Sequence, residues 1–548
     1  MPNSKNTGAS NLVNELIMHD VTTVFGLPGL QLDSIFDALY WEKDNIRVIH
    51  TRHEQAATYM AFGYAQASGK VGTSLVVPGA GILNTMAALS TAYACNSPVL
   101  ALTGQIPSVF IGGGLGILHE IPNQLTALAS VTKWQGHIAS TDQVEPVMEE
   151  AFQQLQTGRR RPVVVEIPMD IAAQPAAAPA PKEQAIAELG KIDGLDEDAI
   201  SAAANLLANA VNPAIFVGGG IWGAEKSLLA LAELLQAPVF VTPHALGAID
   251  SRHPLAQSMQ VANDVWSTID VALAIGTRFL HPVLDWGCDD SVKIVRVDID
   301  PIQASLPKAS DITIVGGAKE ATSAILALLE QKIAPRKSKH EIWTERKFQT
   351  DKRYGDLLQA QRDYTHAIRN AVPDDAVFCF DVTQLHFYSW FGFPAYHPRS
   401  VIQPGYQGTL GYGYPTALGA KVAMPGKPVI YIGGDGGFMF NCQELSTAMH
   451  FGINVIAVIF NDGAFGNVRR IQKEQFGERY ISSDLHNPDF VRLAESFGTA
   501  AMRTDSPAGL AKLIQEALAR DEPTLIEVEV MAMPNPHPHL FTRRVRPG

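Results

Sequence analysis

Two aspartates follow neighbouring apolar runs near residue 430, and their spacing could place a metal ion between them. Asp435 lies in VIYIGGDGG, directly after the first run, and Asp462 lies in INVIAVIFNDG, directly after the second. In an open parallel sheet the carboxyl ends of adjacent strands meet at one edge, where ligands bind. Two carboxylates there would repel each other unless a cation lies between them, and Mg²⁺ takes few protein oxygens and completes its octahedron with phosphate oxygens. The pair therefore predicts a Mg²⁺ site that holds a diphosphate.

Glycines surround the first aspartate. Gly434, Gly436 and Gly437 let the backbone approach a ligand closely, and they precede the helical pattern FMFNCQELSTAMHFG, whose first N–H groups favour an anion. The alternative is that Asp435 caps this helix and Asp462 makes a turn. A GDG sequence followed at this spacing by an Asn–Asp pair favours the metal site.

The elements that must position these residues alternate along nearly the whole chain. Continuous apolar runs such as IRVIH, PVLALTG, PVVVEIP, VALAIG and PTLIEVEV predict strands buried on both faces, and helical patterns separate them. This alternation predicts parallel sheets in α/β layers. A chain of 548 residues exceeds one core. An Ala/Pro linker at 170–190 and a basic stretch at 328–343 divide it into three α/β domains, which we place at 1–180, 190–335 and 345–548.

Composition excludes several classes of protein. With 42 Lys+Arg against 55 Asp+Glu, the net charge of −13 argues against a nucleic-acid partner. The four cysteines form no CxxC pair, so neither a zinc site nor a disulfide framework is indicated. The polar N-terminus lacks a signal-peptide core and no apolar run is long enough to span a membrane, so we expect a cytoplasmic protein without a membrane partner.

At these residues the chain resembles the thiamine-diphosphate (ThDP) enzymes of the acetolactate synthase, benzaldehyde lyase and pyruvate decarboxylase superfamily. Their motif for Mg²⁺ and diphosphate begins with GDG and ends in Asn-Asn; here it ends in Asn461-Asp462. The resemblance implies Mg²⁺ ligands at Asp435, Asp462 and the backbone carbonyl of Ala464. It covers the whole chain, and the family's pyrimidine-binding, central and diphosphate-binding domains match the three predicted domains in order.

The first domain resembles the family's segments around the pyrimidine ring of the cofactor. The stretch IHTRHEQAATYMAFGYAQASG places Glu54 at the cofactor-activating glutamate, and VVPGAGILNT places Asn84 near the site. A buried carboxylate on the aminopyrimidine can favour its imino form, which removes the thiazolium proton to give the ylid. The alternatives are an ordinary ion pair between Glu54 and Arg52 and a Glu54 that faces solvent from a helix.

Two segments of the third domain resemble cofactor-binding loops. QPGYQGTLGYGYPT implies that Leu410 props the folded cofactor and that backbone groups of Gly408 and Leu410 bind its pyrimidine. DVTQLH resembles a loop on the diphosphate side and implicates Thr383 and Gln384. The alternatives are that Leu410 belongs only to the core and that the loop is only a turn.

Residues that would select the reaction resemble different family members. Gln105 in ALTGQIP resembles acetolactate synthase, whereas GILHEIPNQL places His119 where benzaldehyde lyase has a glutamine, and Gln31 falls where that lyase has a histidine. A histidine near the cofactor can relay protons near neutral pH; the alternative for His119 is a loop residue without a role. Ile471 stands where acetolactate synthase has a tryptophan.

The resemblance implies a ThDP- and Mg²⁺-dependent carboligase or lyase. It would form or cleave a C–C bond next to a carbonyl in 2-oxo acids, aldehydes or 2-hydroxy ketones, through a ThDP ylid and an enamine. The alternatives are an FAD-containing acetolactate synthase, an acyl-CoA enzyme such as oxalyl-CoA decarboxylase or 2-hydroxyacyl-CoA lyase, and a degenerate member that only binds ThDP. The family's site is shared between subunits, which implies a homodimer or homotetramer.

The central domain carries three runs that resemble strand ends holding FAD or ADP in the family. They are FVGGGIWGAE, AIGTRF and VRVDIDP. The sequence after Phe279 lacks the acidic-acidic-Arg run of the FAD enzymes. We therefore expect neither FAD nor ADP, and a nucleotide-binding fold that is kept only as structure.

Overall fold

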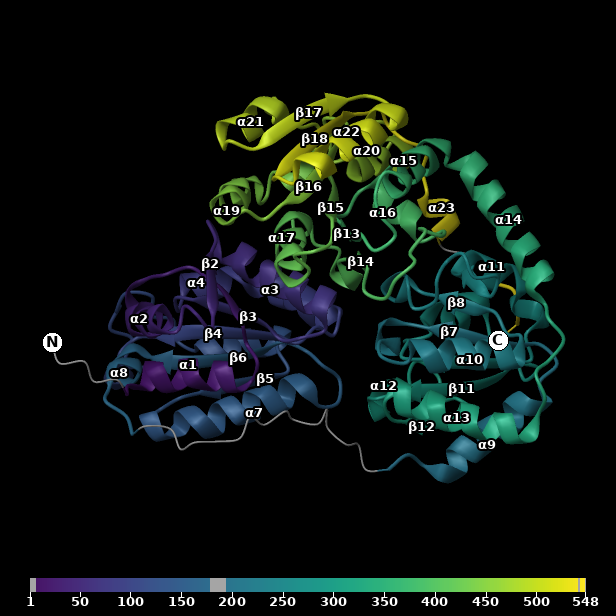
Figure 1. Cartoon of the computed structure of the whole chain (residues 1–548), viewed down its shortest axis with the longest axis horizontal. Helices are drawn as coiled ribbons and strands as arrows, with labels where there is room; N and C mark the ends of the chain where they lie inside the picture. Colours follow the sequence, from purple (N-terminus) through teal and green to yellow (C-terminus); the bar gives the residue numbers. More distant parts are fainter. Residues whose placement is uncertain (1–5, 178–193, 541–542, 548) are drawn as a thin grey trace.

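The computed structural model describes residues 6–177, 194–540 and 543–547, and it contains three six-stranded sheets flanked by helices (Figure 1). Every strand pair in the three sheets is parallel. The predicted fold class, three parallel-sheet α/β domains, is confirmed. The boundaries proposed above stay predictions, and most of the predicted Ala/Pro linker lies outside the described residues.

The N-terminal sheet has the strand order β2-β1-β3-β4-β6-β5. Its strands are β1 (Thr23–Gly26), β2 (Arg47–His50), β3 (Gly72–Val76), β4 (Val99–Gln105), β5 (Trp134–His137) and β6 (Val163–Pro168). Its helices are α1 (Gly8–Met18), α2 (Asp33–Trp41), α3 (Glu54–Ser68), α4 (Ala80–Asn84), α5 (Met86–Ala94), α6 (Gln124–Leu128), α7 (Val144–Gln156) and α8 (Met169–Ala173).

The central sheet has the order β12-β11-β10-β7-β8-β9. Its strands are β7 (Pro213–Val217), β8 (Val239–Val241), β9 (Ala256–Ser258), β10 (Val271–Ile275), β11 (Lys293–Asp298) and β12 (Ile312–Val315). The helices around it are α9 (Glu197–Asn209), α10 (Glu225–Leu235), α11 (Met259–Val265), α12 (Pro301–Ala304) and α13 (Ala318–Lys332).

The C-terminal sheet repeats the pattern with the order β14-β13-β15-β16-β18-β17, and the long helix α14 (His340–Leu357) leads into it from the central domain (Figure 1). Its strands are β13 (Val377–Phe380), β14 (Val401–Ile402), β15 (Val429–Gly434), β16 (Val455–Asn461), β17 (Ala500–Thr504) and β18 (Thr524–Glu529). The further helices are α15 (Gln359–Asn370), α16 (Gln384–Ser389), α17 (Gly413–Ala423), α18 (Asp435–Phe438), α19 (Leu445–Phe451), α20 (Gly466–Gln475), α21 (Phe490–Ser496), α22 (Pro507–Arg520) and α23 (His537–Leu540).

The N-terminal and C-terminal domains share one hydrophobic core, which forms where α3 packs on α17 (Figure 1). Glycines let the two helices approach closely. A Cβ atom at Gly63 would lie 2.0 Å from the carbonyl oxygen of Thr416, and one at Gly419 would lie 1.9 Å from that of Met60. Any side chain at either glycine would therefore separate the helices. No helix of the described ranges combines the length and the apolar character needed to cross a lipid bilayer.

Candidate functional site

The first group of predicted residues, which we call the aspartate corner, comes from the segments that follow the adjacent parallel strands β13, β14, β15 and β16, and from the end of β15 itself. It contains Thr383, Gln384, Gly408, Leu410, Gly434, Asp435, Gly436, Gly437, Asp462 and Ala464. Gly434 pairs in register with Phe460, so Asp435 and Asp462 follow two adjacent strands. Both strands have continuous apolar sequences and are buried in the sheet, and the charged residues follow directly after the strands end.

The side-chain amide of Asn487, which was not predicted from the sequence, also lies in the aspartate corner. Asn487 donates through Nδ2 to Asp435 Oδ2 at 2.6 Å and to Asn461 Oδ1 at 3.0 Å. The Gly463 N–H donates to the same two oxygens, at 3.1 and 3.2 Å. The loop that holds Ala464 is fixed by an antiparallel bridge to Asp484. Hydrogen bonds from two segments, at Gly463 and at Asn487, therefore orient the Asp435 carboxylate.

The two carboxylates have the electrostatics of a cation site. Burial raises the pKa of Asp435, and burial together with the charge of Asp435 raises the pKa of Asp462 to about 6. Each aspartate thus resists ionisation in the absence of a compensating cation. The available donors are carboxylate and carbonyl oxygens, which are the hard ligands that Mg²⁺ takes. The residues present fit Mg²⁺.

Thr383 and Gln384 lie beside the glycine turn. Thr383 Oγ1 lies 3.7 Å from the position of a Cβ atom built on Gly434. The side-chain oxygen of Gln384 is buried and has no hydrogen-bond partner among the described residues. Below them, the fully buried Asp381 accepts hydrogen bonds from the Tyr431 hydroxyl at 3.2 Å and the Gly413 N–H at 3.3 Å, and burial raises its pKa to about 6. Sequence reasoning missed this buried carboxylate.

The helix expected after the glycine turn is interrupted, which corrects the prediction of one continuous helix. The structure has the single turn α18, a short 3₁₀ segment at Cys442–Glu444, and then α19. Asn441 opens the 3₁₀ segment and donates through Nδ2 to the carbonyl of Gly411 at 2.7 Å. That bond ties the loop containing Gly408 and the half-buried Leu410 to the aspartate corner.

The second group of predicted residues, which we call the glutamate group, lies in the N-terminal domain and contains Gln31, Glu54, Asn84, Gln105 and His119. Glu54 opens α3, and Asn84 ends α4 and donates through Nδ2 to Glu54 Oε2 at 3.1 Å. His53 Nδ1 lies 3.8 Å from the same oxygen. In the described part of the chain the recorded partners of Glu54 are thus Asn84 and His53, and an ion pair with Arg52 is not among them.

Gln31 and His119 form a directed hydrogen-bonded pair. Gln31 is 2% exposed, and its Nε2 donates to the carbonyl of Leu118 at 2.9 Å. This bond turns the Gln31 oxygen toward His119 Nδ1, 2.9 Å away. Because a carboxamide oxygen only accepts, His119 carries its proton on Nδ1 in this arrangement, and Nε2 has a free lone pair when the ring is neutral. The His119 backbone adopts φ +69°, a left-handed conformation that few non-glycine residues take.

The Gln105 carboxamide forms hydrogen bonds to other groups of the protein through both its oxygen and its nitrogen. Its Oε1 accepts from the Ile106 N–H at 2.8 Å, and its Nε2 donates to Glu166 Oε2 at 3.2 Å. Gln105 is 5% exposed. Its predicted catalytic role stays a prediction, and its recorded contacts are structural.

The two groups are separate within one chain. Across the described ranges, no hydrogen bond or ion pair joins a member of the aspartate corner to a member of the glutamate group. Exposed apolar side chains flank both groups. Leu118 precedes His119 and is 58% exposed, and Phe440 follows α18 and is 51% exposed.

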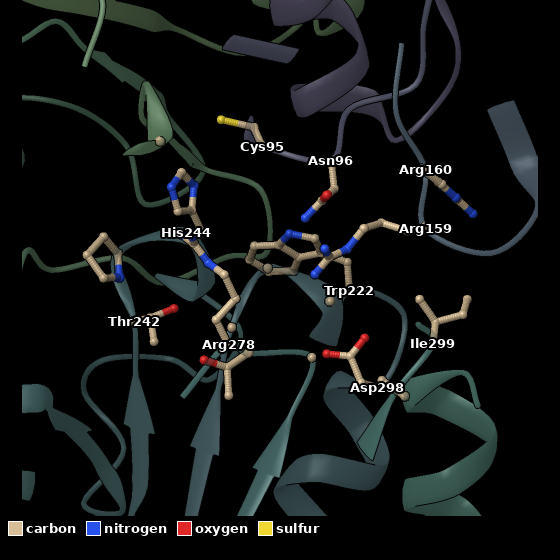
Figure 2. Close-up of a pocket in the computed structure, with 18 of the residues that line it drawn as sticks. Cys95, Asn96, Arg159, Arg160, Trp222, Thr242, His244, Arg278, Asp298 and Ile299 are labelled. Atoms are coloured by element: carbon tan, nitrogen blue, oxygen red, sulfur yellow. The ribbon is translucent and has the colours of Figure 1, made fainter. Parts of the chain in front are cut away.

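A cavity of about 1030 Å³ lies where the central domain meets the N-terminal domain and the C-terminal domain, which contributes His386 and Gln403 to its lining (Figure 2). The three glycine and aspartate runs of the central domain converge on it, through Gly218 after β7, Gly276 after β10 and Asp298 at the end of β11. Arg159 and Asn96 reach it from the N-terminal domain. Our expectation that this cavity holds neither FAD nor ADP stays a prediction.

Among the described residues, one cluster of metal-ligand type side chains lies outside these regions: Glu233, His253 and His340. His253 Nδ1 accepts from the Leu255 N–H at 3.2 Å, and His253 Nε2 lies 2.9 Å from Glu233 Oε1. Burial lowers the pKa of His253, so the neutral ring carries its proton on Nε2 and donates it to Glu233. The ring offers no free nitrogen in this arrangement, and the cluster is a hydrogen-bonded contact between α10 and α14.

Comparisons with known proteins cover the three domains. Models of thiamine pyrophosphate enzymes match residues 6–129 (N-terminal TPP binding domain), 200–325 (central domain) and 381–528 (C-terminal TPP binding domain). A probable acetolactate synthase large subunit of Methanococcus aeolicus is 34% identical over 95% of this chain and 92% of its own length. Acetolactate synthase isozyme 3 large subunit of Escherichia coli is 31% identical over 99% and 97% of the two chains. A probable 2-ketoarginine decarboxylase of Pseudomonas aeruginosa is 31% identical over 96% and 94%.

Proposed function

The chain belongs to the thiamine pyrophosphate enzyme family, and on this premise we propose that it makes or breaks a carbon–carbon bond next to a carbonyl group. The observation that carries the proposal is the aspartate corner, where Asp435 and Asp462 follow adjacent strands and a cation between them would offset the cost of their burial and repulsion. One relative is named for 2-ketoarginine, a 2-oxo acid, and others for acetolactate, which has a hydroxyl next to a ketone. We therefore propose 2-oxo acids as the first substrates to test, followed by aldehydes and 2-hydroxy ketones.

In this proposal the aspartate corner binds the charged end of the cofactor. Asp435, Asp462 and the carbonyl of Ala464 would hold Mg²⁺, and Thr383 and Gln384 would contact the diphosphate. The free buried oxygen of Gln384 and the glycine turn beside Thr383 support this assignment. When bound, ThDP supplies a nucleophilic carbon and an electron sink, and the protein supplies orientation and proton transfer.

Glu54 would hold a proton at the pyrimidine ring. Its position at the start of α3 and its hydrogen bond from Asn84 fix the carboxylate, and its side chain is 15% exposed. Glu54 would thereby exchange a proton with the ring while little water competes. Gly408 and Leu410 would bind the other side of the ring.

His119 would move protons on the substrate side through its Nε2 atom. Because Gln31 fixes the proton on Nδ1, Nε2 can accept a proton and return it. Gln31 therefore acts by orienting His119, and we assign it a positioning role in place of the direct catalytic role expected from the sequence.

Replacing Gln31 by Leu is expected to lower kcat about 10-fold, the factor that corresponds to losing one hydrogen bond of about 1.4 kcal/mol. KM is expected to change little, because Gln31 is assigned no contact with the substrate. The measurement is kcat and KM, with Gln154→Leu on α7 as a control of the same chemistry away from the site. An unchanged kcat in Gln31→Leu, or an equal fall in Gln154→Leu, would exclude the positioning role.

The substrate test is a panel of 2-oxo acids, aldehydes and 2-hydroxy ketones incubated with the protein, ThDP and Mg²⁺. We expect products with a formed or cleaved C–C bond, or CO₂ release, and these can be identified by mass spectrometry. The visible absorbance of the purified protein separates this function from an FAD-containing acetolactate synthase. A bound flavin would contradict our expectation for the central cavity.

We propose that a complete site combines the glutamate group of one subunit with the aspartate corner of a second copy. The separation of the groups in one chain and the exposed apolar side chains beside both support this arrangement. Co-expression of a Glu54→Gln chain with an Asp435→Ala chain tests it. Half of the dimers are mixed and each has one intact site of two, so about a quarter of wild-type activity is expected in a twofold-symmetric dimer. If each chain formed its own site, co-expression would restore nothing.

A further inference from the structure

A buried carboxylate that the proposed chemistry does not use, Glu166, lies on β6 and contacts Gln105 of the glutamate group. Glu166 is 5% exposed. Its Oε2 accepts from Gln124 Nε2 at 2.7 Å and from Gln105 Nε2 at 3.2 Å, and its Oε1 lies 2.9 Å from His137 Nδ1. Three side chains thus converge on this carboxylate, from β4, β5 and the start of α6.

Gln124 connects this carboxylate to the turn before α4. Its Oε1 accepts from the Gly79 N–H at 2.8 Å, while its Nε2 donates to Glu166 and, at 3.2 Å, to the carbonyl of Gly104. The Gly79 N–H can only donate and the Glu166 carboxylate can only accept. The Gln124 carboxamide therefore has a single orientation, set from both sides.

Gly79 is the point where this network meets the glutamate group. It adopts φ +60° and ψ −116°, and a Cβ atom there would lie 2.3 Å from the carbonyl oxygen of His119. The next five residues form α4, whose last residue, Asn84, donates to Glu54. The backbone at Gly79 thus sets where α4 begins, and α4 carries the Asn84 that orients Glu54. The same backbone packs closely against His119.

We propose that Glu166 is a positioning residue that fixes the turn at Gly79 through Gln124 and thereby aligns Asn84 and Glu54. This inference rests on the proposed function for its kinetic consequence, but its structural consequence is measurable in the protein without cofactor. Loss of the carboxylate leaves the Gln124 NH₂ with only the longer hydrogen bond to the Gly104 carbonyl, at 3.2 Å, so the carboxamide is held less firmly against Gly79.

The test replaces Glu166 by Leu, which is similar in size but accepts no hydrogen bond. In the protein without ThDP, amide hydrogen exchange of segment 77–84 is expected to become about 10-fold faster, as for a lost bond of about 1.4 kcal/mol. Exchange in α10 of the central domain should not change. With ThDP and substrate, kcat should fall about 10-fold while the apparent ThDP affinity changes little, because Glu54 is misaligned and the aspartate corner is intact.

Glu15→Leu is the matched control, because Glu15 is also a buried carboxylate of this domain and lies 3.9 Å from a histidine, His19. Unchanged exchange of segment 77–84 in folded Glu166→Leu, or the same change in Glu15→Leu, would overturn the inference. If thermal unfolding shows that Glu166→Leu does not fold, Glu166→Asp decides, since it keeps the charge but withdraws the oxygens by about 1.5 Å. Glu166→Asp should accelerate amide hydrogen exchange of segment 77–84 by less than the factor of about 10 expected of Glu166→Leu. If exchange of this segment is not accelerated at all, the inference is overturned. An inactive wild type would refute the proposed function and leave the exchange result valid.

Discussion

Replacing Glu54 by Gln is expected to lower kcat about 1000-fold, within the range that a positioned acid–base group contributes. The substitution preserves shape, and the Gln oxygen can still accept the hydrogen bond from Asn84. What it removes is the ability to gain and lose a proton. Binding of ThDP should therefore stay within about 3-fold of wild type, because the diphosphate contacts in the other domain are untouched.

Three measurements on Glu54→Gln separate the roles. Steady-state kinetics gives kcat, calorimetry gives the ThDP dissociation constant, and NMR gives the rate of hydrogen–deuterium exchange at the reactive carbon of the bound cofactor. We expect kcat and the exchange rate at the reactive carbon to fall together, while the ThDP dissociation constant stays within about 3-fold of the wild-type value. Glu15→Gln serves as the control for removing a buried charge from the same domain. Normal turnover in Glu54→Gln would refute the proton-transfer assignment.

Replacing Asp435 by Ala is expected to weaken Mg²⁺-dependent binding of ThDP at least about 100-fold, because a deleted buried, charged partner costs about 3–5 kcal/mol. The Gly463 N–H and Asn487 also lose an acceptor. Calorimetric titration of ThDP with and without Mg²⁺ measures the effect, and circular dichroism tests whether the variant is folded.

Asp462→Asn tests the second proposed Mg²⁺ ligand and is compared with Asp435→Ala. It keeps an oxygen at the position where the family motif has Asn, and it removes a carboxylate whose pKa is raised by burial and, to a smaller extent, by repulsion from Asp435. Its ThDP affinity should stay within about 10-fold of wild type, since one oxygen ligand is retained. A folded Asp435→Ala protein that bound ThDP and Mg²⁺ normally would refute the metal assignment.

The sequence predicted those features that depend on local pattern. Apolar runs bounded by glycine placed Gly434 and Asp435 at a strand end, and the helix between two such runs made β15 and β16 parallel neighbours. This register brings Asp462 to the same edge. Glu54 and Asn84 were singled out by resemblance alone, and their places at the start of α3 and the end of α4 come from the structure.

Contacts between distant segments were not predictable in this way. Asn487 reaches Asp435 from 52 residues away, and Glu166 reaches Gln124 from 42 residues away, and neither belongs to a spaced motif. The break after α18 also escaped prediction, because FMFNCQELSTAMHFG has a continuous helical pattern. Asn441 bonds to Gly411 of another segment, and this tertiary contact overrides the local preference.

The close crossing of α3 and α17 has a consequence for the proposed dimer, in which each site combines residues of two subunits. Glu54 opens α3, and α17 belongs to the domain that carries Asp435 of the same chain. In the proposed dimer these two residues serve different active centres, so the interlocked glycine helices form a stiff mechanical link between the two centres. In that dimer, a movement of one C-terminal domain would also displace Glu54 of the same chain, which serves the other centre, so the two centres would be mechanically coupled.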